Sequence, residues 1–104
     1  MKRLILLLSF IFISGISLSQ THQISGTVKD AKFGEGLSFA TVKVIDTAYG
    51  TVADAKGNFV LYLPNGDYKI SFSNLGYFSV EKFITVNNEN QMINIELERG
   101  GVYT

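Results

Sequence analysis

Residues 59–72, FVLYLPNGDYKISF, decide the fold class of this chain. Large apolar side chains recur at every second position on both sides of a central turn. This period of two is typical of β-strands that bury one face and expose the other. The segment 64–67 predicts a reverse turn, because Asn65 and Gly66 tolerate the positive φ that hairpin turns need. The alternating residues are Phe59, Leu61 and Leu63 before the turn and Tyr68, Ile70 and Phe72 after it.

The same alternation continues outward from this segment in both directions. It is clear over 24–28, 40–44 and 93–97, and 48–54 adds at most a short strand interrupted by Gly50. Turn residues separate these stretches, and no helical stripe is convincing in the rest of the chain after the first 19 residues. About seven short strands of this kind predict an all-β fold, a seven-stranded β-sandwich of antiparallel strands with Greek-key connections.

One stretch departs from the pattern. In 77–86, Lys82 falls on the same face as the apolar residues Phe78, Val80, Ile84 and Val86. An edge strand or a β-bulge near Lys82 would resolve this conflict, since an inward-pointing lysine also discourages pairing with other edges.

The first residues have the layout of an export signal. Two basic residues precede an apolar run over 4–13, and small side chains at Ser17 and Ser19 suit a signal peptidase. We expect a signal peptide at 1–19, cleaved between Ser19 and Gln20. The apolar run is shorter than the about 20 residues that cross a bilayer, and a retained membrane anchor is the alternative interpretation.

Composition excludes several classes of function. The 104 residues include 9 Lys+Arg, 9 Asp+Glu, one His and no Cys. The absence of cysteine excludes disulfides, thiolate metal sites and cysteine nucleophiles. After cleavage Lys2 and Arg3 are lost, so 7 basic residues face 9 acidic ones and the 85-residue remainder carries a net charge of −2. This balance lacks the basic footprint of a nucleic-acid-binding domain, and we expect no nucleic-acid partner.

Six motifs follow one another in the order of a known family. They are ISGTVKD at 24–30, GL at 36–37, ATVKV at 40–44, GTVADAKGNF at 50–59, LPNGDYKI at 63–70 and FSNLGY at 72–77. Together they resemble the carboxypeptidase regulatory-like domain, a transthyretin-like (prealbumin-like) seven-stranded sandwich, over about 22–98.

The resemblance implies a context for the domain. Such domains follow the signal peptide of many TonB-dependent outer-membrane receptors and flank some exported peptidases, and they carry no catalytic residues themselves. It therefore implies a non-catalytic accessory or interaction domain that is exported to the periplasm or outer membrane. The partner would be a protein at the outer membrane or the remainder of a longer receptor chain that takes up nutrients.

The residues themselves support a non-catalytic interpretation. A zinc carboxypeptidase needs two histidines and a carboxylate on the metal and a glutamate as base, and hydrolases of the transthyretin fold use several histidines and arginines. The chain after residue 19 offers only His22 and Arg99, and a serine triad would also need a suitable histidine. We predict no enzyme activity, no cofactor, and no catalytic, cofactor-binding or metal-ligating residue.

Two local features could still suggest a site. Asp54, Gly57 and Asn58 carry oxygen ligands of the kind that calcium binds, but too few acidic residues accompany them. We predict instead a turn in which Asp54 accepts backbone N–H groups and Gly57 relieves strain. His22 lies near the expected cleavage site, where we expect a frayed, solvent-exposed terminus. Phe59, Tyr68 and Tyr77 are predicted core residues, and a buried tyrosine hydroxyl needs a partner.

A carbohydrate-binding module is the alternative function. It would need an exposed aromatic platform, for which Tyr49, Tyr62 and Phe39 are the candidates, with Val60 and Phe33 as further apolar groups that could be exposed. The interpretation that we favour is ordinary packing of these residues on the second sheet or against the loop at 30–38.

The sequence divides into a signal peptide at 1–19, a sandwich domain at 20–98 and a tail or linker start at 99–104. Gly100 and Gly101 favour a linker, and therefore the front end of a longer receptor over a free-standing domain.

Overall fold

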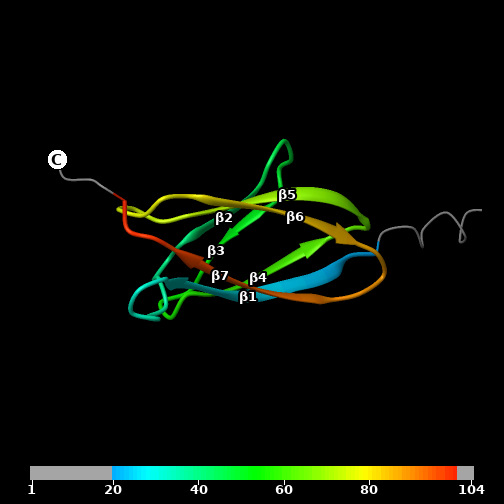
Figure 1. Ribbon diagram of the computed structural model, residues 1–104. Coiled ribbons are helices and arrows are strands. Elements are labelled where there is room, and N and C mark those ends of the chain that lie inside the picture. Colours follow the sequence, from blue (N-terminus) through cyan, green and yellow to red (C-terminus); the bar gives the residue numbers. More distant parts are fainter. Residues whose placement is uncertain (1–19, 101–104) are drawn as a thin grey trace, which may run out of the picture.

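The computed structural model describes residues 20–100, which form seven strands and no helix. Figure 1 shows two stacked layers, one with the strand order β4-β1-β7 and the other with the order β3-β2-β5-β6. The predicted all-β sandwich is confirmed, while the predicted signal peptide lies outside the described residues. The strands are β1 (His22–Asp30), β2 (Thr41–Val44), β3 (Gly50–Val52), β4 (Asn58–Leu63), β5 (Gly66–Ser73), β6 (Val80–Val86) and β7 (Gln91–Leu97).

Within residues 20–100, no helix has the length and apolarity that crossing a membrane requires.

The strand pairing differs from the prediction at one place. All neighbouring strands are antiparallel except β1 and β7, which run parallel with Ile24 opposite Gln91 and Asp30 opposite Leu97. The assumption of a wholly antiparallel fold is therefore wrong. Parallel neighbours need a long crossover, and here the chain between the two strands passes through the other sheet before it returns.

The core lies between the two sheets and consists of the alternating residues of the sequence pattern. Phe59 on β4 and Phe72 on β5 meet across it, with ring centroids 5.7 Å apart. Each large side chain buried in this way contributes about 1.5–3 kcal/mol to stability. The largest fully buried side chains are Phe72, Ile24, Leu63, Ile70, Leu97, Val28, Val42, Val44 and Val86.

The predicted hairpin turn at 64–67 has a different role. It connects β4 to β5, which belong to different sheets, so the two strands form no hairpin. Gly66 takes a positive φ of 155°, but Asn65 does not have a positive φ. The Asn65 side chain instead contacts Asn88: its Oδ1 accepts the Asn88 N–H at 2.8 Å, and its Nδ2 donates to the Asn88 Oδ1 at 2.9 Å.

The conflict at Lys82 is resolved by an edge. β6 lies at the edge of its sheet and pairs with β5 in an unbroken register, in which Lys82 stands opposite the buried Ile70. Lys82 is nevertheless exposed, because the core-facing side of an edge strand can direct a long side chain to solvent. The edge-strand prediction is confirmed, and the bulge is wrong.

Gly26 allows β1 and β7 to approach each other. A Cβ built at this position would overlap the carbonyl group of Ile93 on β7. Any residue with a side chain would therefore separate the central strand of the sheet from its parallel neighbour.

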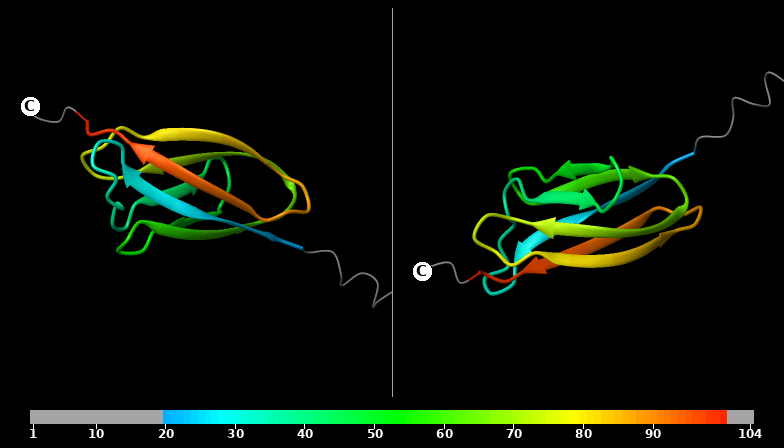
Figure 2. Two further views of the ribbon diagram at one scale, coloured as in Figure 1. Left: turned by 60° about the horizontal axis from the view of Figure 1, so that its bottom comes forward. Right: turned by 90° about the horizontal axis from the view of Figure 1, so that it is seen from above.

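The described chain enters and leaves the sandwich at opposite ends. Figures 1 and 2 show residue 20 and the segment after β7 at opposite extremes of the long axis. The parallel arrangement of β1 and β7 produces this geometry, since one begins where the chain enters and the other finishes where it leaves.

Candidate functional site

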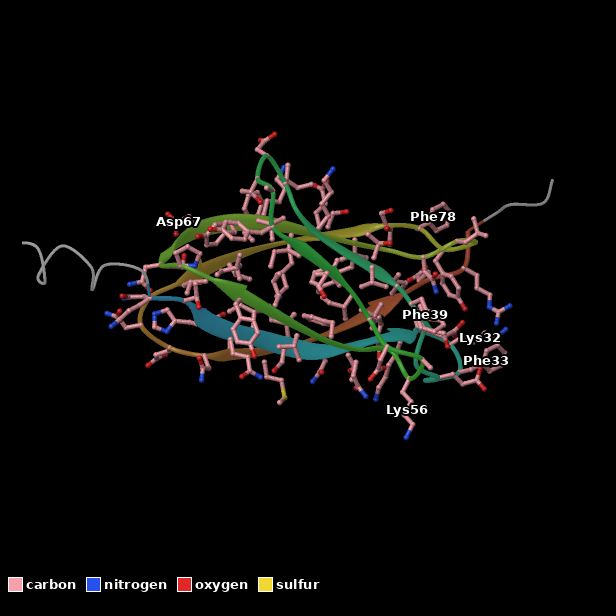
Figure 3. All side chains as sticks on the ribbon, turned by 180° about the vertical axis from the view of Figure 1, so that it is seen from behind. Lys32, Phe33, Phe39, Lys56, Asp67 and Phe78 are labelled. Carbon is pink, nitrogen blue, oxygen red and sulfur yellow. The ribbon has the colours of Figure 1, made fainter. Side chains whose placement is uncertain are left out.

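Several polar and aromatic side chains that are not part of the hydrophobic core lie at one end of the sandwich. β1 and β7 finish there, and the backbone N–H of Phe78 donates to the carbonyl of Glu98 at 2.8 Å, which ties a loop to the segment after β7. Figure 3 shows Lys32, Phe33, Phe39, Lys56 and Phe78 at this end and Asp67 near the other.

Asp30 is the buried anchor of this end, and only 2% of its surface is exposed. Its Oδ1 accepts the backbone N–H groups of Lys32 and Phe33, each at 2.8 Å. Its Oδ2 accepts the Tyr77 hydroxyl at 2.7 Å and the Nε–H of Arg99 at 3.1 Å. These bonds, led by that from Phe33, hold the pKa of the carboxyl far below its usual range. Such a group stays ionised and fully engaged, so it is a poor general acid or base.

The strand pattern explains why Asp30 is buried. Ile24, Gly26, Val28 and Asp30 occupy alternate positions of β1, so Asp30 ends the core-facing row of the strand. Its position directly before the turn lets the carboxylate accept the N–H groups two and three residues later. Sequence reasoning did not identify Asp30, although an acidic residue on the apolar face of a strand was the available signal.

Tyr77 and Arg99 meet the carboxylate from two other segments and also form an antiparallel bridge with each other. The hydrogen bond to Asp30 raises the pKa of the Tyr77 phenol, with burial as the second cause. The same carboxylate raises the pKa of the Arg99 guanidinium, chiefly through its hydrogen bond. A further bond from the Gly100 N–H to the Gly76 carbonyl at 2.8 Å holds the segment after β7 against the β5–β6 loop.

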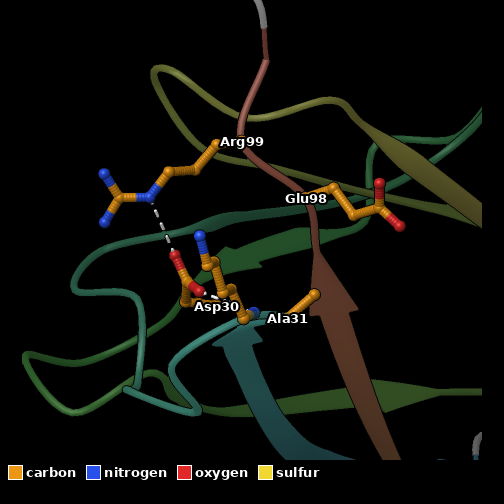
Figure 4. A pocket seen from close by; sticks show the side chains of 5 residues that line it. Asp30, Ala31, Glu98 and Arg99 are labelled. Atoms are coloured by element: carbon orange, nitrogen blue, oxygen red, sulfur yellow. Dashed lines mark hydrogen bonds and ion pairs between the residues drawn. The ribbon is translucent and has the colours of Figure 1, made fainter.

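The Arg99 guanidinium is also stacked on aromatic rings. Its Cζ lies 5.6 Å from the ring centroid of Phe33 and 5.8 Å from that of Tyr77, and the Lys32 ammonium lies 5.4 Å from the Phe33 centroid. Asp30, Lys32 and Arg99, with two neighbours, line a shallow cavity of about 440 Å³. Figure 4 shows the cavity, with Arg99 bonded to Asp30 through Nε.

Four apolar side chains of the β1–β2 and β5–β6 loops are exposed. The exposed fractions are 60% for Phe33, 64% for Phe39, 59% for Phe78 and 96% for Leu75. Phe39 also has a φ of 59°, a left-handed conformation that is strained for a bulky residue. We call Phe33, Phe39, Leu75 and Phe78, together with Lys32 and Arg99, the aromatic end.

The Asp54 motif forms the predicted turn. Its Oδ1 accepts the N–H groups of Lys56 at 2.8 Å and Asn58 at 2.9 Å, and Gly57 has a φ of 85°. The bond from Asn58 is the first cause of a lowered Asp54 pKa, and that from Lys56 is the second. No group of three or more His, Cys, Asp or Glu residues suitable for a metal occurs within residues 20–100.

The two predicted core tyrosines are only partly buried and pack against the core. Each hydroxyl has the expected partner: Tyr77 donates to Asp30, and Tyr68 donates to the Pro64 carbonyl at 2.8 Å.

His22 is not a frayed, exposed residue as predicted. It is the first residue of β1, pairs with Leu63 and is partly buried. Its Nε2 is buried without a hydrogen-bond partner among the described residues. About eight residue steps of ~3.3 Å separate it along β1 from Asp30, so the histidine and the buried carboxylate cannot act as an acid–base pair.

The predicted carbohydrate platform is not assembled. Tyr62 lies on the outer face of β4, Tyr49 lies in the β2–β3 loop and Phe39 belongs to the aromatic end. All three are exposed, but no ring contact joins them within residues 20–100, where the recorded ring pair is Phe59 with Phe72. The favoured prediction, that these side chains pack on the second sheet or against the 30–38 loop, is therefore wrong.

A model of the CarboxypepD_reg-like domain matches residues 24–103, which is most of the chain. The chain belongs to this family. The resemblance inferred from the sequence motifs is therefore confirmed. The aromatic end belongs to the CarboxypepD_reg-like domain of this chain.

Relatives of this domain include much longer proteins. Carboxypeptidase D of Homo sapiens and that of Mus musculus are each 34% identical over 84 residues, which is 79% of this chain but 6% of each relative. The chain thus corresponds to a small part of carboxypeptidase D, a regulatory-like domain rather than the catalytic one.

Solved structures share the fold at lower identity. A cohesin–X-dockerin complex from Acetivibrio cellulolyticus matches with a TM-score of 0.65 at 17% identity, over 76% of this chain and 58% of that one. A DUF3823 family protein from Parabacteroides merdae matches with a TM-score of 0.60 at 13% identity, over 78% of this chain and 47% of that one.

Proposed function

We propose that this CarboxypepD_reg-like domain is a non-catalytic contact module that binds another protein through its aromatic end. The observation that carries the proposal is the exposure of Phe33 and Phe39 in the β1–β2 loop and of Phe78 in the β5–β6 loop, at the same end of the sandwich. Exposed apolar groups clustered on one surface, with polar groups around them, mark interaction sites.

The strain at Phe39 supports a binding role. A left-handed backbone costs a bulky residue about 1–2 kcal/mol, and glycine or asparagine would avoid most of it. A 64% exposed phenyl ring recovers little of this through burial. Strained residues persist at functional sites, where the strained conformation places the side chain for its task.

The chemistry of the site supports binding over catalysis. The Asp30 carboxylate uses its oxygens in four hydrogen bonds, and the single histidine lies at the other end of the same strand. Asp30 and His22 therefore do not form the kind of site in which a base activates a neighbouring nucleophile.

For the setting, we propose export to the periplasm or outer membrane, in association with TonB-dependent nutrient uptake. The basis is the signal-like segment at 1–19 and the occurrence of such domains beside other domains in exported bacterial proteins. A structural neighbour from a cohesin–X-dockerin complex adds an example of this fold within a protein assembly.

Site-directed photo-crosslinking tests the contact surface. A benzophenone amino acid at Phe39 or Phe78, introduced in the native cells, should yield one discrete protein adduct. The matched control is the same amino acid at Phe83, which is 77% exposed on the outer face of β6. Equal adducts at Phe83, or none at the aromatic end, would refute the proposal.

A further inference from the structure

We infer that the aromatic end recognises an acidic side chain, Asp or Glu, flanked by apolar residues on the partner protein. This inference rests on the proposed function and names the chemistry of the same site.

The first support is the preorganisation of Arg99. Its Nε is held by the buried Asp30 at 3.1 Å, and its planar guanidinium is stacked on Phe33 and Tyr77. Figure 4 shows its two Nη groups directed away from Asp30, and 62% of the side chain is exposed. Because the fork is already fixed, a carboxylate can bind it in a bidentate manner with little loss of side-chain freedom.

The second support is a neighbouring cation without an ion pair. Lys32 lies over the same Phe33 ring, and it takes part in neither of the two salt bridges within residues 20–100. Asp30 and Glu98 also line the cavity, so its lining carries no net charge, but Lys32 itself has no ion-pair partner within residues 20–100. A carboxylate on the partner would satisfy it.

The acidic neighbour does not occupy this position. Glu98 follows β7 directly and also lines the cavity. Figure 4 shows its side chain on the opposite side of the segment from Arg99, as expected for consecutive residues of an extended chain. The Arg99 fork therefore stays open to a carboxylate from outside.

The third support is the apolar surround. Phe33 contacts both cations and is 60% exposed, and Phe39 and Phe78 are exposed at the same end of the sandwich. Phenylalanine offers no hydrogen-bonding group, so these rings favour apolar side chains next to the acidic one.

The test is a selection of random dodecapeptides displayed on phage against the purified protein, followed by fluorescence anisotropy with a labelled peptide from the selection. We expect enriched peptides to carry Asp or Glu beside apolar residues. Replacing that acid with its amide should weaken binding ~10-fold, the scale of one charge-assisted bidentate pair.

Variants of the protein locate the contact. R99Q and K32Q should each weaken binding, and R99Q should make the protein indifferent to the acid-to-amide change in the peptide. K32Q leaves every bond of Asp30 in place, so its effect is separable from folding. K43Q removes an exposed cation from the outer face of β2 and should leave affinity unchanged.

Four outcomes would overturn the inference. Enriched peptides without an acidic residue would show that the site does not select a carboxylate. Equal weakening of binding by K43Q would show the same. If Phe39→Ala abolished binding and R99Q left it unchanged, carboxylate recognition by Arg99 would be refuted, while the proposed contact surface would stand. Cosedimentation with phosphatidylglycerol vesicles that R99Q abolishes would assign the site to a lipid surface instead.

Discussion

The hydroxyl of Tyr77 donates a 2.7 Å hydrogen bond to the buried carboxylate of Asp30, which lies 47 residues earlier in the chain. This bond joins the end of β1 in one sheet to the β5–β6 loop of the other. Arg99 donates to the same oxygen from the segment after β7, so two donors that are distant from β1 in the sequence share one acceptor. The aromatic end is therefore organised around a single buried charge.

Tyr77→Phe should lower the midpoint of thermal unfolding by about 4–8 °C, the shift expected when a domain of this size loses one net hydrogen bond. The ring remains, so its packing is preserved while Asp30 loses a donor. Tyr62→Phe is the matched control, because the Tyr62 side chain is 56% exposed on β4. Equal midpoints for the two variants would show that the Tyr77 hydroxyl has no stabilising role.

Stability should fall in acid through Asp30. Its pKa is lowered in the folded state, so its contribution is fully present above the unfolded-state pKa of about 4. It is lost progressively as the pH falls below that value toward the folded-state pKa. Urea unfolding from pH 7 to pH 2 should show this loss, and Asp30→Asn should flatten the curve and lower its neutral plateau. Asp46→Asn in the exposed β2–β3 loop should retain the wild-type curve.

Phe39→Asn should increase the free energy of unfolding by about 0.5–1 kcal/mol, because asparagine tolerates the left-handed backbone better than a bulky residue. The same substitution should weaken partner binding. Phe78→Asn removes a ring of similar exposure without positive φ, so it should not stabilise the domain. Chemical denaturation measures both variants, and a destabilised Phe39→Asn protein would contradict the interpretation of strain.

Gly26→Ala should destabilise the domain by more than about 3 kcal/mol, because a Cβ at this position overlaps the Ile93 carbonyl and β1 cannot keep its distance from β7. Gly34→Ala provides the comparison. A Cβ there meets no atom within 4 Å, and the cost is limited to its φ of 75°, about 1 kcal/mol. Far-ultraviolet circular dichroism and urea unfolding would separate the two variants, and similar losses would argue against the close approach.

Lys82→Val should promote self-association, because it makes the core-facing row of the β6 edge continuously apolar. Analytical ultracentrifugation should detect the oligomers. Lys43→Val changes charge and hydrophobicity equally on the outer face of β2, a strand that is paired on both sides. If the Lys43→Val variant self-associated to the same extent, the loss of a surface charge would be the cause, rather than the exposure of an apolar edge strand.

Periodicity predicted the strands well and their partners less well. Rows such as Phe59, Leu61 and Leu63 state which face is buried, and the structure buries them. A row of this kind does not state which strand lies beside it. The parallel pairing of β1 with β7 and the passage from β4 to β5 between sheets both depend on contacts between residues far apart in the sequence.

The candidate site was harder to predict for the same reason. The turn at Asp54 is local, with acceptor and donors within four residues, and it was predicted correctly. Asp30 depends on Tyr77 and Arg99, which are 47 and 69 residues away. The position of Asp30 on an apolar face gave a sign of burial, but the sequence contains no sign of those partners.

The parallel alignment of β1 and β7 has a mechanical consequence. Tension applied at the two ends of the described chain would pull these neighbours past each other along their length, since one carries the entry and the other the exit. Their interstrand hydrogen bonds lie across the direction of such a load, so they would have to rupture together rather than one at a time. Such a load would therefore shear β1 past β7 and would not unzip the pair.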